Sequence, residues 1–324
     1  MLLQRQKIAV RVVNLEGQVY SMNVFSKQLS GLGNQLFQYA AGLYFAEKYK
    51  GKLFVIQEPV EGTLSHGNYN RPFLLSRFQI TSPIRPKNRL DHLMLSLGPR
   101  GLKISAPLKA LGRIAVRHET REERYHFIED LEFSPGTRTL YLSGYWQTYK
   151  YAESVALKLR QEFRLQEPPQ GNNQRLLEQI DAAPVSVSLH VRRGDYTLAA
   201  EGNIALPLDY YHRAIDLIRQ RFENPLFFIF SDDIEFARAN LPAGMRQVFV
   251  EGNDDFSSQE DLRLMSACQH HIIANSSFSW WGAWLNPGSE KIVVAPRHWL
   301  LSPESAFPDL LPPTWHALDS LRSR

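Results

Sequence analysis

The sequence has a single cysteine and no long apolar run, and each absence excludes a class of protein. Cys268 is the only cysteine among 324 residues, which rules out internal disulfides and cysteine-rich zinc or iron–sulfur sites. Apolar runs such as Leu226–Phe230 fall far short of the ~20 residues that span a bilayer. Arg5, Lys7 and Arg11 interrupt the apolar core that a secretion signal would need. We therefore expect a soluble, cytoplasmic protein.

A large excess of one charge is also lacking. The 37 lysines and arginines stand against 33 acidic residues, a formal net charge of +4. This balance argues against a nucleic-acid partner and suits an anionic small ligand, with peripheral contact to a membrane surface as an alternative location. The hydrophobic share of 44% and charged share of 22% are ordinary globular values and exclude intrinsic disorder.

Strand and helix patterns alternate along both halves of the chain, which predicts parallel α/β structure. In the first half the pattern is strand, glycine turn, helix and strand, one βαβ unit. Its expected elements are strands at 8–13, 19–25 and 53–56 and a helix at 36–46. Between about 165 and 300 the alternation predicts a doubly wound sheet. Its expected strands are 184–191, 226–230, 247–250, 272–274 and 291–295, and its helices 208–222, 232–240, 257–268 and 277–285.

These patterns predict a two-domain organisation. We expect an N-terminal domain at 1–160, a C-terminal domain at 161–300 and a tail at 301–324. Residues 81–125 are basic and irregular, and we interpret them as a solvated, partly helical insertion, with a glycan- or membrane-facing surface as the weaker alternative.

Polar residues follow three strands of the second half at the edge where an open parallel sheet binds ligands. His190, Arg192, Arg193 and Asp195 follow the first, Asp232 and Asp233 the second, and Asn275, Ser276, Ser277 and Phe278 the third. Arginine forks and the backbone N–H groups of a helix start both bind phosphate oxygens, which predicts a nucleoside-diphosphate site. Taken singly, the aspartates and serines are also ordinary helix caps. The tryptophans at 280, 281 and 284 favour a core role over a ligand platform.

The glycine turn matches neither common nucleotide motif. Gly31 and Gly33 are followed by Leu36 where a dinucleotide fingerprint has a third glycine, and no lysine follows as in a phosphate-binding P-loop. Asn34 instead offers a neutral amide at a helix start. No Asp-x-Asp follows a strand, so we expect arginines rather than a metal ion to neutralise the ligand's charge.

Four long segments, taken in order, resemble the motifs of the α-1,2-fucosyltransferases (glycosyltransferase family 11). They are 31–40, GLGNQLFQYA; 190–196, HVRRGDY; 230–233, FSDD; and 275–285, NSSFSWWGAWL. The segments 70–73, NRPF, and 144–147, GYWQ, are similar to weaker landmarks of that family. One departure is Ser30, which stands where the family usually has another glycine. The resemblance covers about residues 30–298. Members of that family generally begin just before the glycine turn, so the resemblance implies that residues 1–21 are an extension and that Met22 is an alternative start.

The resemblance implies a GT-B fold, in which two Rossmann-like domains face a cleft. It also implies inverting, metal-independent transfer of L-fucose from GDP-β-L-fucose to the 2-hydroxyl of a terminal β-galactoside. By similarity, Arg192 would hold the β-phosphate, His190 would lie against the guanosine and Asp261 would bind the guanine base. Ser276 and Ser277 would hold the phosphates, and Asn34 would approach the reacting centre.

Two matters stay open at this stage. The general base is unassigned: Asp195, Asp232 and Asp233 are candidates, no spacing singles one out, and a phosphate oxygen takes the proton in the remaining alternative. The alternative functions are an α-1,6- or protein-O-type fucosyltransferase that uses the same donor, and a catalytically inactive nucleotide- or glycan-binding module.

Overall fold

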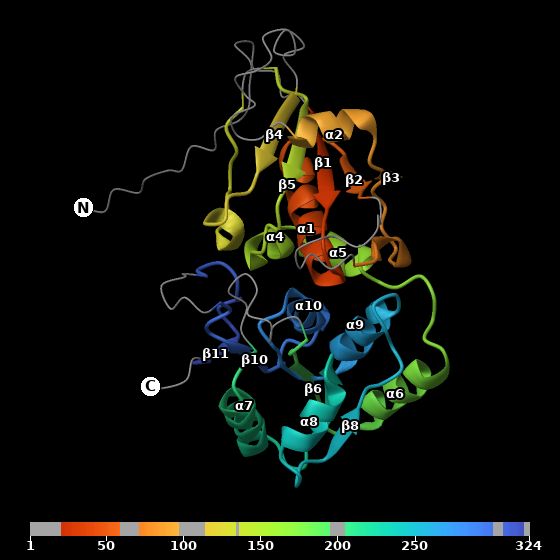
Figure 1. Ribbon diagram of the computed structural model, residues 1–324, viewed down its shortest axis with the longest axis vertical. Coiled ribbons are helices and arrows are strands. Elements are labelled where there is room, and N and C mark those ends of the chain that lie inside the picture. The colour runs from red at the N-terminus through yellow and green to blue at the C-terminus, as the bar shows by residue number, and fades with distance from the viewer. Residues whose placement is uncertain are drawn as a thin grey trace, which may run out of the picture.

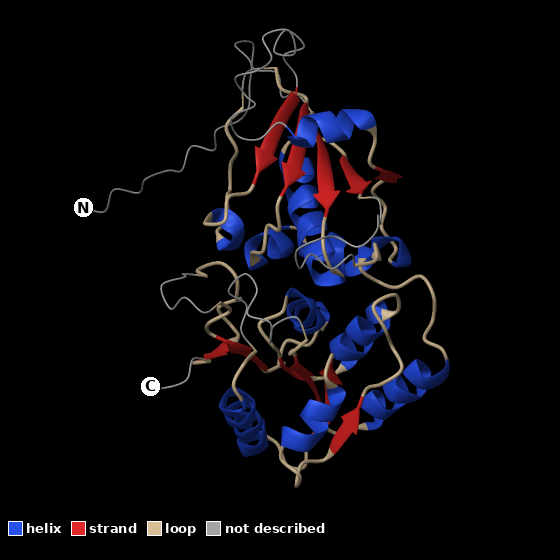
Figure 2. Ribbon diagram, in the orientation of Figure 1, coloured by secondary structure: helices blue, strands red, loops and turns tan. Residues whose placement is uncertain are grey.

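The computed structural model describes residues 21–58, 71–96, 114–133, 136–194, 205–300 and 307–320. These residues form two parallel β-sheets with helices packed on them, which confirms the expected α/β class (Figure 1 and Figure 2). The strand expected at 8–13 and residues 1–20 of the possible extension lie outside the described residues.

The N-terminal sheet has the strand order β3-β2-β1-β5-β4, with every neighbouring pair parallel. Its strands are β1 (Asn23–Gln28), β2 (Leu53–Gln57), β3 (Ile84–Pro86), β4 (Ile114–His118) and β5 (Thr139–Ser143). Helix α1 (Leu32–Lys48) connects β1 to β2 and confirms the predicted βαβ unit. It begins four residues before the expected Leu36, because the carbonyl of Gly31 already accepts from the backbone N–H groups of Asn34 and Gln35.

Where the structure describes residues 81–125, they are mostly exposed or half-buried and partly helical, as interpreted, but they are not an insertion outside the sheet. Strands β3 and β4 from this region form the two edges of the N-terminal sheet. Helix α2 (Arg89–Ser96) packs beside them, and its Asp91 is fully buried in an ion pair with Arg85. The many arginines concealed these short strands, since an edge strand needs few apolar residues. Residues 97–113 lie outside the described residues.

The C-terminal sheet has the strand order β11-β10-β9-β6-β7-β8, again all parallel. Its strands are β6 (Ser186–Val191), β7 (Leu226–Ser231), β8 (Gln247–Phe249), β9 (His270–Ile272), β10 (Val293–Pro296) and β11 (His316–Leu318). Counted from β6, this is the Rossmann order 3-2-1-4-5-6, whose ligand site lies where the order reverses, between β6 and β9. Strand β9 starts two residues before the expected 272 and includes the buried His271, whose Nδ1 pairs with the Ser188 hydroxyl of β6 at 2.8 Å.

The remaining helices are α4 (Tyr149–Ser154), α5 (Ala156–Glu162), α6 (Gly171–Ala182), α7 (Leu208–Arg221), α8 (Ile234–Asn240), α9 (Ser258–Ala267) and α10 (Ser277–Leu285), with short 3-10 turns η1 (Leu75–Arg77) and η3 (Glu123–Tyr125). Among them, α7, α8, α9 and α10 agree closely with the helices predicted for the second half, whereas α4, α5 and α6 were not predicted. No described helix has the length and apolar character needed to cross a membrane.

Helices α1 and α10 join the two halves of the molecule. Trp280 and Trp281 are fully buried, which confirms their core role, and both rings contact Phe37 of α1 at centroid distances of 4.6 and 5.0 Å. Gly33 lies against the start of α10, where a Cβ atom would come within 2.4 Å of the backbone nitrogen of Phe278. The glycine at 33 therefore permits the close approach of two helix N-termini.

The tail also contacts both halves. Strand β11 extends the C-terminal sheet beside β10, whereas Asp309 forms an ion pair with Lys150 and accepts from the backbone N–H of Phe127 at 2.8 Å. The contacts of Asp309 show that the tail packs back across the first half.

Replacing Gly33 with alanine tests the close approach of α1 and α10. We expect a loss of about 1–3 kcal/mol in the free energy of unfolding, because backbone atoms of α10 cannot move aside as a flexible side chain would. Urea denaturation measures it. Gly244→Ala is the matched control, since a Cβ atom there meets nothing within 4 Å. Equal stability of the two variants would contradict this account of Gly33.

Candidate functional site

Two arginines and two aspartates meet at the carboxyl ends of β6 and β7. Arg192 Nη1 lies 3.0 Å from Asp232 Oδ2, and Arg193 Nε lies 3.2 Å from Asp233 Oδ2. The backbone N–H of Arg193 donates to Asp232 Oδ1 at 2.8 Å, and a Cβ atom at Gly194 would lie 2.5 Å from Asp232 Oδ2. The turn after β6 is therefore fixed by carboxylates from the turn after β7.

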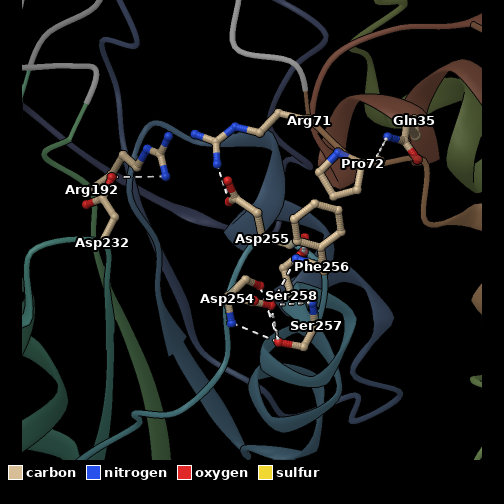
Figure 3. Close-up of polar contacts among 10 residues, drawn as sticks. All are labelled: Gln35, Arg71, Pro72, Arg192, Asp232, Asp254, Asp255, Phe256, Ser257 and Ser258. Atoms are coloured by element: carbon tan, nitrogen blue, oxygen red, sulfur yellow. Dashed lines mark hydrogen bonds and ion pairs between the residues drawn. The ribbon is translucent and has the colours of Figure 1, made fainter. Parts of the chain in front are cut away.

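The two arginines differ in what surrounds them. The guanidinium of Arg193 stacks 3.4 Å from the ring centroid of Phe236, and its partner Asp233 also caps α8 by accepting from the Phe236 N–H. Arg193 is thus held against α8. Arg192 projects from the carboxyl end of the central strand β6, in the direction of the other half of the molecule (Figure 3). Of the two predicted phosphate-binding arginines, Arg192 is the better placed.

His190 lies in β6, two residues before Arg192, and is buried. Burial, reinforced by the positive charge of Arg192, lowers its pKa to about 3. The ring is therefore neutral at physiological pH, and it meets the ring of Phe278 edge-on at a centroid distance of 6.1 Å. It lines the reversal point of the sheet as an uncharged hydrogen-bonding group.

The N-terminus of α10 faces the same reversal point from β9. Ser276 caps this helix by accepting from the Phe278 N–H at 3.3 Å, as the cap interpretation predicted. Asn275 is buried and donates to the carbonyl of Trp299 at 3.0 Å. The first backbone N–H groups of α10 carry the positive end of the helix dipole and so favour an anion.

Asn34 connects this helix start to the N-terminal sheet. Its Oδ1 accepts from Ser277 Oγ at 2.8 Å and from Gln147 Nε2 at 2.6 Å, while its Nδ2 donates to Ser30 Oγ at 3.1 Å. Ser30 has φ = +65°, the left-handed conformation that glycine adopts most easily. The hydrogen bond to Asn34 explains how serine is accommodated at a position where a glycine was expected.

Gln147 follows β5, and the turn that carries it is held by a buried glutamate. Glu119 accepts from the backbone N–H groups of Tyr145, at 2.7 Å, and of Trp146, which has φ = +55°. Burial of Glu119 raises its pKa to about 7 against the effect of these two hydrogen bonds. In the sequence this turn is only a weak landmark. Glu119 could not be assigned to it, because more than 25 residues separate Glu119 from the N–H groups that it binds.

Asp261 lies on α9, away from the arginines. Its carboxylate accepts from Asn253 Nδ2 at 2.7 Å, and Asn253 in turn pairs with Asn173 of α6. Burial raises the pKa of Asp261 to about 6. A carboxylate in this setting can accept two N–H groups of a flat ring edge.

Arg71 is a site residue from the segment 70–73, a weaker landmark to which the sequence assigned no role. It enters from the N-terminal half, just before η1, and forms an ion pair with Asp255 in the loop before α9 (Figure 3). Its side chain passes over the glycine turn, since a Cβ atom at Gly31 would lie 3.7 Å from Arg71 Cγ. No sequence signal marks the pair, because its partners are 184 residues apart.

A cavity of about 350 Å³ opens beside this ion pair. It lies between the segment 72–77, residues 166 and 167, Gln57 and the exposed ring of Phe256. Its lining therefore combines aromatic rings with amide, hydroxyl and carboxylate groups.

Two further expectations concern the candidate base and a metal ion. Asp195, the candidate base, lies outside the described residues. Across the described part of the chain, no three His, Cys, Asp or Glu side chains gather as a metal ligand set.

The chain matches the family model described as "Glycosyl transferase family 11" over residues 115–318. It is 30% identical to the Escherichia coli O-antigen biosynthesis glycosyltransferase WbnK, covering 85% of this chain and 94% of that protein. It is 30% identical to an E. coli α-1,2-colitosyltransferase (90% and 97%) and 26% identical to a rat galactoside α-(1,2)-fucosyltransferase 1 (79% and 61%).

The fold is that of a solved fucosyltransferase. The crystal structure of the α-1,6-fucosyltransferase NodZ soaked with GDP-fucose, an enzyme known from Bradyrhizobium, superposes with a TM-score of 0.50. The sequence identity is 17%, and the match covers 82% of this chain and 93% of that one. The two-sheet, GT-B-like architecture is therefore confirmed.

Replacing Glu119 with glutamine tests how its raised pKa acts on stability. The folded state favours the protonated carboxyl, so this group's contribution to stability is full below about pH 4.5 and is lost as the pH rises through about 7. We expect wild-type stability to fall over that range by on the order of 1–3 kcal/mol more than in Glu119→Gln. Urea titrations at pH 5 and pH 8 measure the difference. Identical pH slopes in the two proteins would contradict it.

Proposed function

The chain belongs to glycosyltransferase family 11, and we propose that it transfers L-fucose from GDP-β-L-fucose to the 2-hydroxyl of a terminal β-galactoside. The observation that carries this proposal is the placement of two positive groups beside the reversal point of the C-terminal sheet: Arg192 follows β6, and the N-terminus of α10 follows the neighbouring strand β9. There Ser277 bonds to Asn34 of the other half. This is where a doubly wound sheet binds a nucleotide, and two positive groups there match a diphosphate.

In this proposal the donor lies along the edge of the C-terminal sheet. Arg192 binds the β-phosphate, the Ser276 and Ser277 end of α10 binds the remaining phosphate oxygens, and Asp261 accepts from the guanine edge. Arg193, Asp232 and Asp233 keep the turns after β6 and β7 in place. Asn34 joins the site from the glycine turn near the departing sugar.

The reaction requires stabilisation of the charge that develops on the leaving diphosphate. As the bond from fucose to the β-phosphate stretches, negative charge grows on the phosphate oxygens and positive charge on the anomeric carbon. A guanidinium and helix N–H groups that are already in position stabilise that charge without reorganisation. We propose that these groups suffice without a metal ion and that attack from the opposite face inverts the anomeric centre.

The acceptor hydroxyl must lose a proton during transfer. Asp232 and Asp233 already accept from arginine and from backbone N–H groups, so each of their carboxylate oxygens has a partner. Asp195 is therefore the proposed general base. The 350 Å³ cavity beside Phe256 is the proposed entry for the acceptor, since sugar rings pack on exposed aromatic faces.

A second candidate is transfer of colitose, which the similarity to an α-1,2-colitosyltransferase favours. Fucose carries a 3-hydroxyl that colitose lacks. Incubation with GDP-fucose or GDP-colitose and each of lactose, N-acetyllactosamine and chitobiose, followed by NMR of the product, distinguishes the donors and linkages. A 2-linked fucose formed equally with and without EDTA supports the first candidate and metal independence together. Hydrolysis of donor with no transfer to any acceptor would contradict both candidates.

Arg192→Ala tests the phosphate-binding role. We expect the transfer rate to fall by about 10²–10³-fold or more, because one preorganised charge opposite the leaving group is lost. The melting temperature should stay close to that of the wild type, since the side chain is partly exposed. Retention of more than about a tenth of the activity would remove Arg192 from the mechanism. Arg246→Ala, which removes an exposed arginine of the C-terminal half, is the control for loss of charge.

Asp261→Asn tests recognition of the base. The ionised carboxylate accepts from guanine, so the wild-type affinity for GDP should weaken as the pH falls through about 6, where Asp261 gains a proton. At pH 8 the variant should bind GDP at least tenfold more weakly than the wild type does. Its affinity for GDP should lack the change that protonation of Asp261 causes in the wild type near pH 6. Calorimetric titrations at pH 5.5 and 8 measure both. An unchanged pH response in the variant would exclude Asp261.

A further inference from the structure

Arg71 is held beside the proposed donor site by buried contacts. Gln35, which is 2% exposed in the first turn of α1, donates to the Pro72 carbonyl at 2.8 Å and accepts from the Leu74 N–H at 3.0 Å. These two hydrogen bonds fix the chain that carries Arg71 against the glycine turn. The guanidinium then reaches across to the C-terminal half, and Figure 3 shows it pointing toward that of Arg192.

Asp255, the partner of Arg71, contributes little to its own loop. The loop before α9 is closed by Asp254, whose Oδ1 accepts from the N–H groups of Phe256 and Ser257 at 3.0 Å and from Ser257 Oγ at 2.7 Å. The Asp255 side chain is 56% exposed and turns instead to Arg71. An ion pair this open contributes little to stability, so a stronger anion can replace the carboxylate.

Each of the three arginines in this region is paired with an aspartate. Arg192 and Asp232, and likewise Arg193 and Asp233, belong to the same sheet edge, whereas Arg71 and Asp255 belong to opposite halves. A guanidinium binds phosphate as a bidentate partner just as it binds a carboxylate. Among these three pairs, that of Arg71 is the one that brings a positive charge from the N-terminal half.

Building on the proposed function, we propose that Arg71 binds the outer phosphate of the nucleoside diphosphate opposite Arg192. Asp255 holds the guanidinium in place until the donor displaces the carboxylate. Two arginines from opposite halves would then clasp one phosphate, and the charge that develops on it would be shared between them.

The test is GDP and GMP binding by isothermal titration calorimetry, with full-length wild type, Arg71→Ala, Arg71→Lys and Asp255→Asn. We expect Arg71→Ala to bind GDP at least tenfold more weakly, because a charged hydrogen bond is lost, and GMP as the wild type does, because GMP lacks the outer phosphate. Arg71→Lys should be intermediate for GDP, since lysine cannot bind in bidentate form. Asp255→Asn should bind GDP about two- to fivefold more tightly, because the competing anion is removed.

Arg246→Ala controls for the loss of one positive charge in a distant part of the C-terminal half, and should bind GDP within twofold of the wild type. Wild-type affinity for GDP in Arg71→Ala would overturn the inference. Equal weakening for GDP and GMP would also overturn it, because it would make Arg71 a structural clamp between the halves. Weaker GDP binding in Asp255→Asn would overturn the role given to Asp255. Failure of the wild type itself to bind GDP would overturn the proposed function as a whole. That result differs from failure of the Arg71 proposal alone, in which the wild type binds GDP and Arg71→Ala binds it equally well.

Discussion

The arrangement of the site depends on the hydrogen bonds of the Asn34 carboxamide. One oxygen accepts from Gln147, which follows β5, and from Ser277, which starts α10, so it joins the strand-order reversal points of both sheets. The orientation of the amide is fixed by its nitrogen, which donates to Ser30. No other common side chain of this size both accepts two hydrogen bonds and donates one in these directions. Gly33 beside it allows the backbones to approach closely enough for the contact to form.

Carboxylates also hold the arginines of the site in position before a ligand binds. A free arginine side chain populates many rotamers, and ordering it on ligand binding costs free energy. Pairing with Asp232, Asp233 and Asp255 limits that cost while the site is empty. The same pairing keeps the region from carrying a large unbalanced positive charge.

Sequence periodicity predicted the C-terminal half well and the N-terminal half less completely. Helix α10 begins and ends where it was predicted, because a serine cap and closely spaced tryptophans mark it without ambiguity. Strand β4 was missed because its residues, Ile114–His118, mix apolar and basic side chains on a sheet edge. At the site, residues that follow strands could be predicted, since the sheet brings strand ends together. Glu119 and Arg71 could not, because each acts on a segment distant in sequence through contacts that only the folded chain creates.

The path of the tail has a mechanical consequence. The chain connects the halves near residues 164–170, and on the opposite side of the interface the segment that carries Asp309 bonds to Lys150 and to the Phe127 N–H of the N-terminal half (Figure 1). Separation of the halves about the 164–170 connection would have to break these two contacts, so domain opening and release of the tail are coupled.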